Sequence, residues 1–314
     1  MDVTLPTRPG LLSVVGRTPL VELRHLAPKP GVRLLAKLEG QNPSGSIKDR
    51  IALALVEQAE ARGELKPGDT IVEASTGNTG IAVAMVARQR GYQLKVVIPH
   101  GVVPSIRDVL ELLGVEILWV EPYAGMRGAI ETARALARTR GWFPLNQFGN
   151  ALNVQTHYAC TGTEIAEAAG KVDAFVAGIG TGGTIMGVST RLREDNPDLQ
   201  VIGVEPKMGE HLQGLRSLED GYRPPLLDLD ALSGRFLVSA ARALEAAHQV
   251  ASTEGILAGV SSGAALHAAL RVAERMDEGT IVVMFSDGGW KYLPARPWGA
   301  ARRQDPNLDE THWW

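Results

Sequence analysis

The chain has 314 residues, of which 45% are hydrophobic and 21% are charged, a composition typical of a soluble globular protein with room for two domains of about 150 residues. A formal net charge of −3 argues against nucleic acid or an anionic membrane as a partner, and no apolar run is long enough to cross a bilayer. Cys160 is the only cysteine, which excludes an internal disulfide and a metal site with several thiolates. We therefore expect an unprocessed, cytoplasmic protein that acts on small molecules.

Short apolar segments rich in β-branched residues alternate with longer amphipathic segments along the chain. They predict strands at residues 34–40, 70–75, 94–100, 115–121, 174–180, 200–205 and 280–286. This alternation is typical of βα units in a parallel sheet. The segments from about 45 to 150 form one set and the later segments form a second set, with no Gly/Ser-rich linker between them. The sequence thus predicts an α/β protein whose two domains share a cleft.

A turn-rich run, Asn42–Arg50, comes directly before an amphipathic helical pattern. Ser46 and Asp49 have the spacing of a capping box, which places Lys48 in the first helical turn. The positive end of the helix dipole disfavours an ammonium group there, so the neutral amine needed for Schiff-base chemistry becomes more accessible. A solvated surface role is the common one for lysines, but the glycine and serine turn before Lys48 argues against it.

The loop Ser75–Gly80, with the sequence STGNTG, joins a predicted strand to a helix expected at about residues 79–90. Backbone N–H groups at a helix start, together with short hydroxyl and amide side chains, form a receptor for a carboxylate. A simple capped helix N-terminus would use the same residue types. One such loop does not decide between the two interpretations.

A glycine-rich run, Gly178–Thr184, follows the strand predicted at 174–180. Its glycines allow the backbone to approach a phosphate closely. The run also satisfies the pattern G-x-G-x-x-G, and Glu205 ends the next strand about twenty residues later, as a dinucleotide-binding fold requires. This segment alone supports a nucleotide site and the phosphate cup of a pyridoxal cofactor equally.

Other candidate motifs fail on inspection. Residues 63–70 have the glycine spacing of a P-loop but carry Asp69 where a phosphate-binding lysine is required. The seven histidines are scattered, so we predict no metal site. Cys160 follows Tyr158 in a helical pattern and is expected in the core.

Five motifs, in this order along the chain, resemble those of the cysteine synthase family. Members of that family are fold-type II pyridoxal 5′-phosphate (PLP) enzymes. The motifs are PSGSIKDR at 43–50, STGNTG at 75–80, NQFGN at 146–150, GTGGT at 180–184 and EGILAGVSSGA at 254–264. Their order and spacing run through nearly the whole chain. The resemblance implies an α/β fold of the tryptophan synthase β type, with two open, mostly parallel sheets, and favours the PLP cup over a dinucleotide site.

The resemblance also implies domains and site residues. It implies a smaller, mobile substrate-binding domain at 45–150, a larger PLP-binding domain from 1–44 plus 151–293, a tail at 294–314 and a homodimer. It makes Lys48 the Schiff-base lysine, Asn78 the ligand of the cofactor 3′-oxygen and Ser261 the partner of the pyridine nitrogen. The phosphate is expected on Gly180, Thr181, Gly182, Gly183 and Thr184. The substrate carboxylate is expected on Ser75, Thr76, Gly77, Thr79 and Gln147.

A serine opposite the pyridine nitrogen implies a particular reaction type. A hydroxyl group cannot hold that nitrogen protonated, so the ring is a weaker electron sink than in PLP enzymes with an aspartate there. This favours β-elimination and β-replacement over transamination. In the implied reaction Lys48 gives way to the substrate amine and removes the α-proton as general base. Loss of the leaving group then gives an aminoacrylate, to which sulfide or another sulfur donor adds to form L-cysteine.

Arg216 is expected to select the activated serine. It stands at 212–222, where common O-acetylserine-using members have a glycine-rich stretch. An arginine in the cleft can bind a phosphate dianion through two hydrogen bonds, and the segment resembles that of actinobacterial-type members that use O-phosphoserine. We therefore predict a preference for O-phosphoserine, with O-acetylserine as a possible substrate. The alternatives are a surface arginine paired with Glu219 or Asp220, or a site for an anionic sulfur donor such as thiosulfate, as in the cysteine synthase B branch.

The last part of the chain also resembles the O-phosphoserine branch, through DGGWKYL at 287–293 and a tail that ends in Trp313 and Trp314. In that branch the tail can reach the active site, and a thiocarboxylated carrier protein can supply the sulfur. By contrast, residues 102–105 replace a usual methionine-rich helix start, which leaves partner recognition and closure there undecided.

Other functions are compatible with parts of the pattern. Within PLP enzymes these are a serine/threonine dehydratase and a cystathionine β-synthase-like enzyme. A silent PLP-fold protein that binds the C-terminal peptide of a partner is the non-enzymatic alternative. The intact Lys48 and Gln147 argue against a silent protein.

Overall fold

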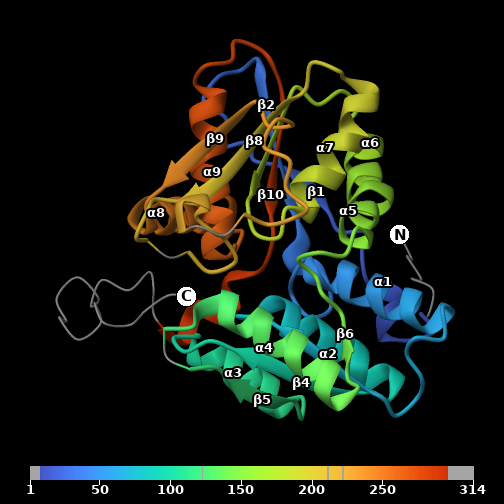
Figure 1. Ribbon diagram of the computed structural model, residues 1–314. Coiled ribbons are helices and arrows are strands. Elements are labelled where there is room, and N and C mark those ends of the chain that lie inside the picture. Colours follow the sequence, from blue (N-terminus) through green and yellow to red (C-terminus); the bar gives the residue numbers. More distant parts are fainter. Residues whose placement is uncertain (1–7, 122, 211, 221–222, 296–314) are drawn as a thin grey trace.

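The computed structural model describes residues 8–121, 123–210, 212–220 and 223–295. These residues form two open sheets flanked by helices (Figure 1). The larger sheet has the order β1-β2-β10-β7-β8-β9, with bounds Leu20–Glu22 (β1), Val32–Leu38 (β2), Gly279–Phe285 (β10), Ala174–Gly178 (β7), Gln200–Pro206 (β8) and Gly234–Val238 (β9). The smaller sheet has the order β5-β4-β3-β6, with bounds Glu116–Trp119 (β5), Gln93–Ile98 (β4), Thr70–Ala74 (β3) and Phe143–Pro144 (β6).

The strand pairings confirm the predicted fold class. Only β1 and β2 pair antiparallel, and every other neighbouring pair of strands in the two described sheets is parallel. Each of the seven predicted strand segments overlaps a strand, with bounds that differ by up to two residues, whereas β1, β6 and β9 were not predicted.

Most of the described helices lie between these strands in sequence order. The α-helices are α1 (Lys48–Ala61), α2 (Asn78–Arg90), α3 (Pro104–Leu112), α4 (Gly125–Arg140), α5 (Leu152–Thr156), α6 (Thr163–Ala169), α7 (Gly183–Asp195), α8 (Ala240–Glu254) and α9 (Val260–Ala273). The shorter helical segments are η1 (Leu11–Val14), η2 (Glu39–Gln41), the π-helical turn η3 (His157–Gly162), η4 (Leu218–Asp220) and η5 (Gly289–Ala295).

The larger sheet is built around β10, although β10 is the last of the described strands in sequence order. Ile281 pairs with Leu34 of β2 on one side and with Ala174 of β7 on the other. Because side chains alternate along a strand, Ile281 packs with α8 and α9 on one face of the sheet, while Val282 packs with α6 and α7 on the opposite face. The almost continuous apolar sequence of β10 reflects burial on both faces.

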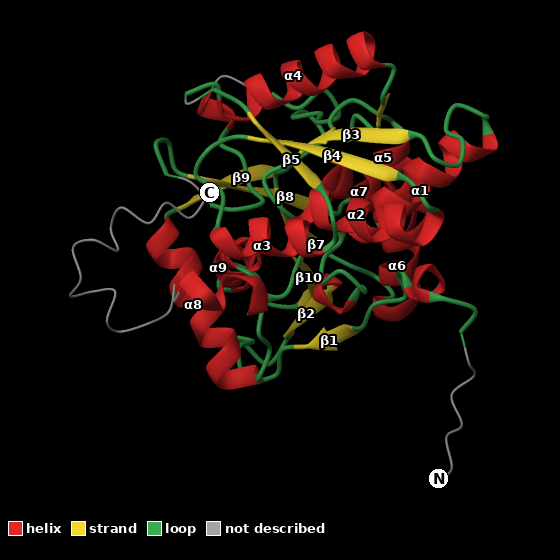
Figure 2. Ribbon diagram, turned by 90° about the horizontal axis from the view of Figure 1, so that it is seen from below, coloured by secondary structure: helices red, strands yellow, loops and turns green. Residues whose placement is uncertain are grey.

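The smaller sheet is also covered on both faces (Figure 2). Ile71 of β3 packs with α1, α2 and α3, whereas its neighbour Val72 packs against α4. Helix α1 connects the two cores: Ile47, directly before it, packs in the core beside α7, while Leu55 packs in the core of the smaller sheet. The start of α1 therefore lies between the two sheets.

The domain limits 45–150, 1–44 plus 151–293, and 294–314 stay predictions. Residues 296–314 of the tail, including Trp313 and Trp314, lie outside the described residues. Within the described part of the chain, no helix combines the length and apolar character needed to cross a membrane.

The expectation that Cys160 lies in the core was wrong. Cys160 is exposed in the turn η3, whereas His157 and Thr161 of the same turn are buried. Since these two residues lie one turn apart, they define the inward face and leave Cys160 on the outward face.

Candidate active site

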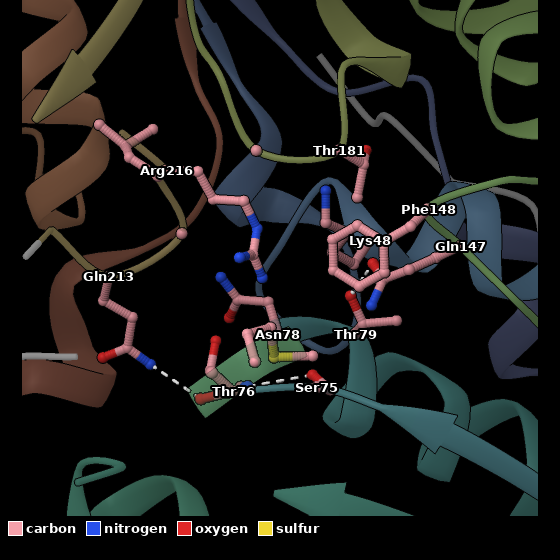
Figure 3. A pocket seen from close by; sticks show the side chains of 15 residues that line it. Lys48, Ser75, Thr76, Asn78, Thr79, Gln147, Phe148, Thr181, Gln213 and Arg216 are labelled. Atoms are coloured by element: carbon pink, nitrogen blue, oxygen red, sulfur yellow. Dashed lines mark hydrogen bonds between the residues drawn. The ribbon is translucent and has the colours of Figure 1, made fainter. Parts of the chain in front are cut away.

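A cleft between the two sheets brings most of the predicted site residues together (Figure 3). About 530 Å³ of space lies inside it, a figure that includes the part open to solvent. Most of its walls come from loops that follow the carboxyl ends of parallel strands, as the fold class predicts. The predicted residues in its lining are Lys48, Ser75, Thr76, Gly77, Asn78, Thr79, Gln147, Gly180, Thr181 and Arg216.

Other lining residues were not among those assigned a role from the sequence. They are Met126, Phe148, Gln213, Gly214 and Leu215. Phe148 belongs to the NQFGN motif and the last three belong to the segment that contains Arg216, so their neighbours in sequence were the available signal. Met126, on α4, carries no motif that could have identified it.

Helix α1 begins at Lys48, as predicted, but not through the predicted capping box. The hydroxyl of Ser46 accepts a hydrogen bond from the Lys48 backbone N–H at 3.3 Å. The carboxylate of Asp49 reaches Ser44 instead of Ser46, and accepts from its backbone N–H at 2.7 Å and from its hydroxyl group. The tight turn at Gly45, with φ of +85°, brings Ser44 within reach of Asp49. Hydrogen bonds from Ser44 to Asp49 thus take the place of the predicted capping box between Ser46 and Asp49.

The loop before Lys48 is also fixed to the end of β10. Ile47 N–H donates to the Ser286 carbonyl at 2.8 Å, and Gly288 N–H donates to the Gly45 carbonyl at 3.2 Å. Burial lowers the pKa of Lys48 to about 8, although the negative charge of Asp287 opposes this shift. Near neutral pH a useful fraction of this amine is therefore unprotonated, which nucleophilic attack on an aldehyde requires.

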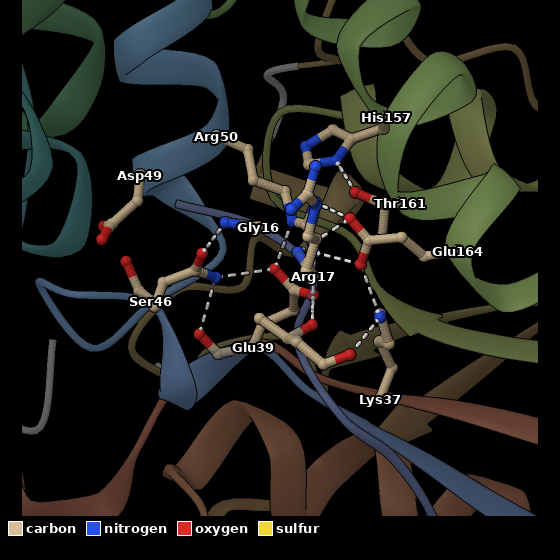
Figure 4. A network of polar contacts seen from close by, with 12 residues as sticks. Gly16, Arg17, Lys37, Glu39, Ser46, Asp49, Arg50, His157, Thr161 and Glu164 are labelled. Atoms are coloured by element: carbon tan, nitrogen blue, oxygen red, sulfur yellow. Dashed lines mark hydrogen bonds and ion pairs between the residues drawn. The ribbon is translucent and has the colours of Figure 1, made fainter. Parts of the chain in front are cut away.

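A buried ionic network holds the first turns of α1 against the larger sheet (Figure 4). Arg50 donates to Glu39 from Nε at 2.7 Å and to Glu164 of α6 from Nη1 at 2.7 Å. Lys37 of β2 donates to the same Glu164 carboxylate at 2.6 Å. Burial alone would raise the pKa of Glu164, but hydrogen bonds and positive charge from Arg50 lower it to about 2. Because a buried charge is costly without a partner, these four side chains fix one another and the position of α1.

The loop Ser75–Gly80 has the geometry of a helix start. The Ser75 hydroxyl accepts hydrogen bonds from the backbone N–H groups of Gly77 and Gly80, both at 3.0 Å. A Cβ atom on Gly77 would lie 2.7 Å from the end of the Ile106 side chain and 2.8 Å from the end of the Gln213 side chain, so both would have to shift to accommodate it. Gln213, from the segment after β8, donates to the Thr76 carbonyl at 3.3 Å and links this loop to the larger sheet. The Ser75 oxygen is thus used to shape the loop.

Gln147 lies on the cleft wall, and both the oxygen and the nitrogen of its side-chain amide form hydrogen bonds. Its Oε1 accepts from the Thr79 hydroxyl at 2.7 Å, and its Nε2 donates to the Ala74 carbonyl at 3.1 Å and to Glu73 Oε1 at 3.3 Å. A carboxylate needs donors, so this amide must give up one of its present acceptors to bind a substrate. Glu73, which the sequence did not identify, therefore competes with a substrate for Gln147.

The buried side chain of Glu73 should make the free energy of unfolding depend on pH. Burial raises its pKa from 4.5 to about 7, although hydrogen bonds from Gln147 oppose the shift. The folded state holds the Glu73 proton more tightly than the unfolded state does. The contribution of this proton to the free energy of unfolding is therefore complete below about pH 4.5 and is lost as pH rises to about 7. We expect a Glu73→Gln variant to gain about 2–3 kcal/mol of unfolding free energy relative to the natural protein over this interval. Unfolding midpoints of the cofactor-free proteins at a series of pH values measure the difference, and parallel profiles would contradict it.

The glycine-rich run after β7 lies at the start of α7. Gly180 and Thr181 line the cleft, while Gly182 has φ of +87° and Gly183 opens the helix. A Cβ atom on Gly183 would lie 2.0 Å from Asn153 Oδ1, a buried oxygen without a hydrogen-bond partner in the described structure. The Thr184 hydroxyl lies 3.2 Å from Nε2 of buried His157.

Two further predicted residues lie next to this run. Glu205, the acidic residue of the dinucleotide alternative, is buried and paired with Arg235 at 2.9 Å and with the Leu218 backbone N–H at 2.7 Å. Both oxygens of its carboxylate are thus already bound by groups of the protein. Ser261, at the start of α9, is not part of the cleft lining, but its Oγ lies 3.6 Å from where a Cβ of the lining residue Gly214 would stand.

Arg216 extends into the cleft from the segment that follows β8 (Figure 3). Its guanidinium carbon lies 4.9 Å from the centroid of the Phe148 ring, and its backbone N–H donates to the Ile179 carbonyl at 2.8 Å. A guanidinium group over an aromatic face is held by a cation–π attraction, which restricts where the Arg216 side chain can lie.

Comparison with known proteins identifies the family. The family described as "Pyridoxal-phosphate dependent enzyme" matches residues 11–287. A cysteine synthase of Staphylococcus aureus is 39% identical over 294 residues, which cover 90% of this chain and 95% of that protein. Cysteine synthase B of Pseudomonas aeruginosa is 39% identical, with 93% and 97% covered. The crystal structure of an O-ureido-L-serine synthase has a TM-score of 0.89 and 34% identity, with 96% and 98% covered. The chain therefore belongs to the cysteine synthase family of fold-type II pyridoxal-phosphate dependent enzymes, and its cofactor is PLP.

Proposed function

We propose that this cysteine synthase-like enzyme prefers O-phosphoserine and converts it to L-cysteine by replacing the phosphate with sulfur. The observation that carries the proposal is the position of Arg216, which shares one cleft with Lys48 and with the Ser75–Thr79 loop. The cleft thus combines a cation suited to a phosphate group with a lysine suited to PLP.

The residues of the cleft fit PLP. The start of α7 offers backbone N–H groups and a positive dipole end to a phosphate. Glycine at 180 and 183 lets this run approach the Gly214 carbonyl and Asn153, which Cβ atoms at these positions would contact at 2.9 Å and 2.0 Å. We propose that Gly180, Thr181, Gly182, Gly183 and Thr184 hold the phosphate. Lys48 would hold the aldehyde carbon, Asn78 the 3′-oxygen and Ser261 the pyridine nitrogen. When bound, PLP supplies the electron sink that makes the substrate α-proton acidic and permits loss of the β-substituent.

The protein itself supplies positioning and proton transfer. Lys48, whose pKa is about 8, is neutral often enough to take the α-proton once the substrate amine has displaced it. The backbone N–H groups of the Ser75–Thr79 loop, together with Gln147, would bind the substrate carboxylate. Since Gln147 now donates to Glu73 and Ala74, we expect its amide to turn on substrate binding.

The phosphate leaving group would bind to Arg216. Two parallel hydrogen bonds from a guanidinium group match a phosphate, and stacking on Phe148 restricts the side chain before the substrate arrives. The cation also stabilises the phosphate dianion as its bond to the β-carbon breaks. The overall exchange consumes O-phosphoserine and sulfide and releases L-cysteine and phosphate.

The test is a side-by-side assay of cysteine formation from sulfide with O-phosphoserine or O-acetylserine. We expect kcat/KM for O-phosphoserine to be higher by about tenfold or more. Equal values, or a preference for O-acetylserine, would contradict the substrate proposal. Deamination of serine or threonine without cysteine formation would contradict the reaction type.

The sulfur donor and the assembly belong to the same proposal. Sulfide serves in the assay, and a thiocarboxylated carrier protein is the alternative donor implied by the resemblance of residues 287–293 to the O-phosphoserine branch. A homodimer is proposed from the resemblance to the cysteine synthase family, and light scattering during size-exclusion chromatography gives the molar mass.

A further inference from the structure

Lys291 is a buried lysine that the proposed reaction does not use. It lies on η5, and only 1% of its side chain is exposed, the same fraction as for the side chain of Asp287. Lysine is seldom buried to this extent, because an ammonium group loses its hydration and needs partners in return. Its contacts should therefore reveal what its burial achieves.

The Lys291 ammonium joins three parts of the cleft. It donates to the Gly45 carbonyl at 3.2 Å, in the loop before Lys48, and to Oδ1 of Asn78, the first residue of α2. It also forms an ion pair with Asp287 at 3.6 Å. Two of these contacts are hydrogen bonds, and the third is an ion pair beyond hydrogen-bond distance.

The carboxamide of Asn78 is held from both ends by this ion pair. Its Oδ1 faces the Lys291 ammonium, and its Nδ2 donates to Asp287 Oδ2 at 2.8 Å. The Tyr292 hydroxyl donates to the same Asp287 oxygen at 2.6 Å and fixes the carboxylate. A reversed carboxamide would place its NH₂ group against an ammonium and its oxygen against a carboxylate. Opposite charges at the two ends thus select one orientation.

We propose that Lys291 is a positioning residue that, with Asp287, orients Asn78 toward the 3′-oxygen of PLP. Asp287 uses one of the two Nδ2 hydrogens of Asn78, and the second is available to an acceptor in the cleft that Asn78 lines. The inference rests on the proposed contact between Asn78 and the cofactor. It explains why a lysine in the DGGWKYL run is buried beside the Lys48 loop.

A double-mutant cycle on PLP binding tests this role. The variants are Lys291→Met, Asn78→Ala and the pair combined, each prepared without cofactor and titrated with PLP. If Lys291 acts through Asn78, each single variant should weaken PLP binding by about tenfold, and the combined variant should bind no more weakly than Asn78→Ala alone. The visible absorption maximum of bound PLP should shift in the same direction in all three variants, since each one removes the oriented donor.

Ser105→Ala is the matched control. Its hydroxyl donates to the Lys291 carbonyl at 2.6 Å, so the variant perturbs the same turn but leaves the ammonium in place. It should bind PLP as the natural protein does. If thermal unfolding shows that Lys291→Met does not fold, Lys291→Gln keeps a donor without the charge and enters the same cycle.

Two results would overturn the inference, and they are distinguishable. Losses that multiply in the combined variant, to about a hundredfold, would mean that Lys291 acts independently of Asn78. Unchanged binding in Asn78→Ala would remove the proposed role of Asn78 and, with it, that of Lys291. Neither result bears on the preference for O-phosphoserine, because no turnover is measured.

Discussion

A Lys48→Ala variant should lose the visible absorption of bound PLP and almost all cysteine formation. The side chain is the proposed attachment point of the cofactor and the proposed base, so both functions disappear together. General-base catalysis alone is worth about 10²–10⁴-fold, and we therefore expect the rate to fall by at least about 10³-fold. Absorption spectra of the protein incubated with PLP, together with the sulfide assay, measure the two effects.

The control for Lys48 is an exposed lysine outside the cleft. Lys66 is exposed in the loop between α1 and β3, and its Lys66→Ala variant should keep both the absorption and the rate. A Lys48→Ala protein that still shows the absorption and turns over substrate would refute the assignment of Lys48.

An Arg216→Ala variant should lose about 10²-fold in kcat/KM for O-phosphoserine while O-acetylserine changes by less than about threefold. Within the substrate, the removed guanidinium would contact only the phosphate group, which O-acetylserine lacks. Steady-state kinetics with both substrates and a fixed sulfide concentration measure the two ratios.

Arg216→Lys separates charge from shape. It keeps the positive charge but lacks the planar pair of donors, so its loss for O-phosphoserine should lie between that of the natural protein and that of Arg216→Ala. Equal losses for both substrates in Arg216→Ala would instead indicate a general role in the cleft, such as support of the Phe148 ring.

The strands that the sequence predicted share one physical property. Long buried strands such as β10 are nearly continuous apolar runs, which leave a clear signal. The missed strands lack it: β6 is only Phe143–Pro144, and the side chains of β9 alternate between partly buried and exposed positions before Val238. Short or half-exposed strands depend on neighbours that the local sequence does not reveal.

The site was predictable where it depends on backbone geometry. The glycine and serine loops near Lys48, Asn78 and Gly180 each require particular residues, so they are visible as motifs. Side-chain partners brought together from distant segments were not predictable. Nothing local marks Lys291 as buried, and Glu73 looks like any polar residue in a strand, yet both contact predicted site residues. The capping box failed because Gly45 allowed Asp49 a closer partner.

The position of β10 has a consequence for how the protein is made. Ribosomes release the chain from its N-terminus, so every strand of the smaller sheet emerges well before residues 279–285. Until then β2 and β7 lack the strand that joins them, and the Lys48 loop lacks its backbone bonds to residues 286 and 288. A chain that ends before residue 288 should therefore be unable to capture the cofactor at the proposed site, which makes PLP uptake a marker of synthesis beyond that residue and leaves shorter chains open to proteases.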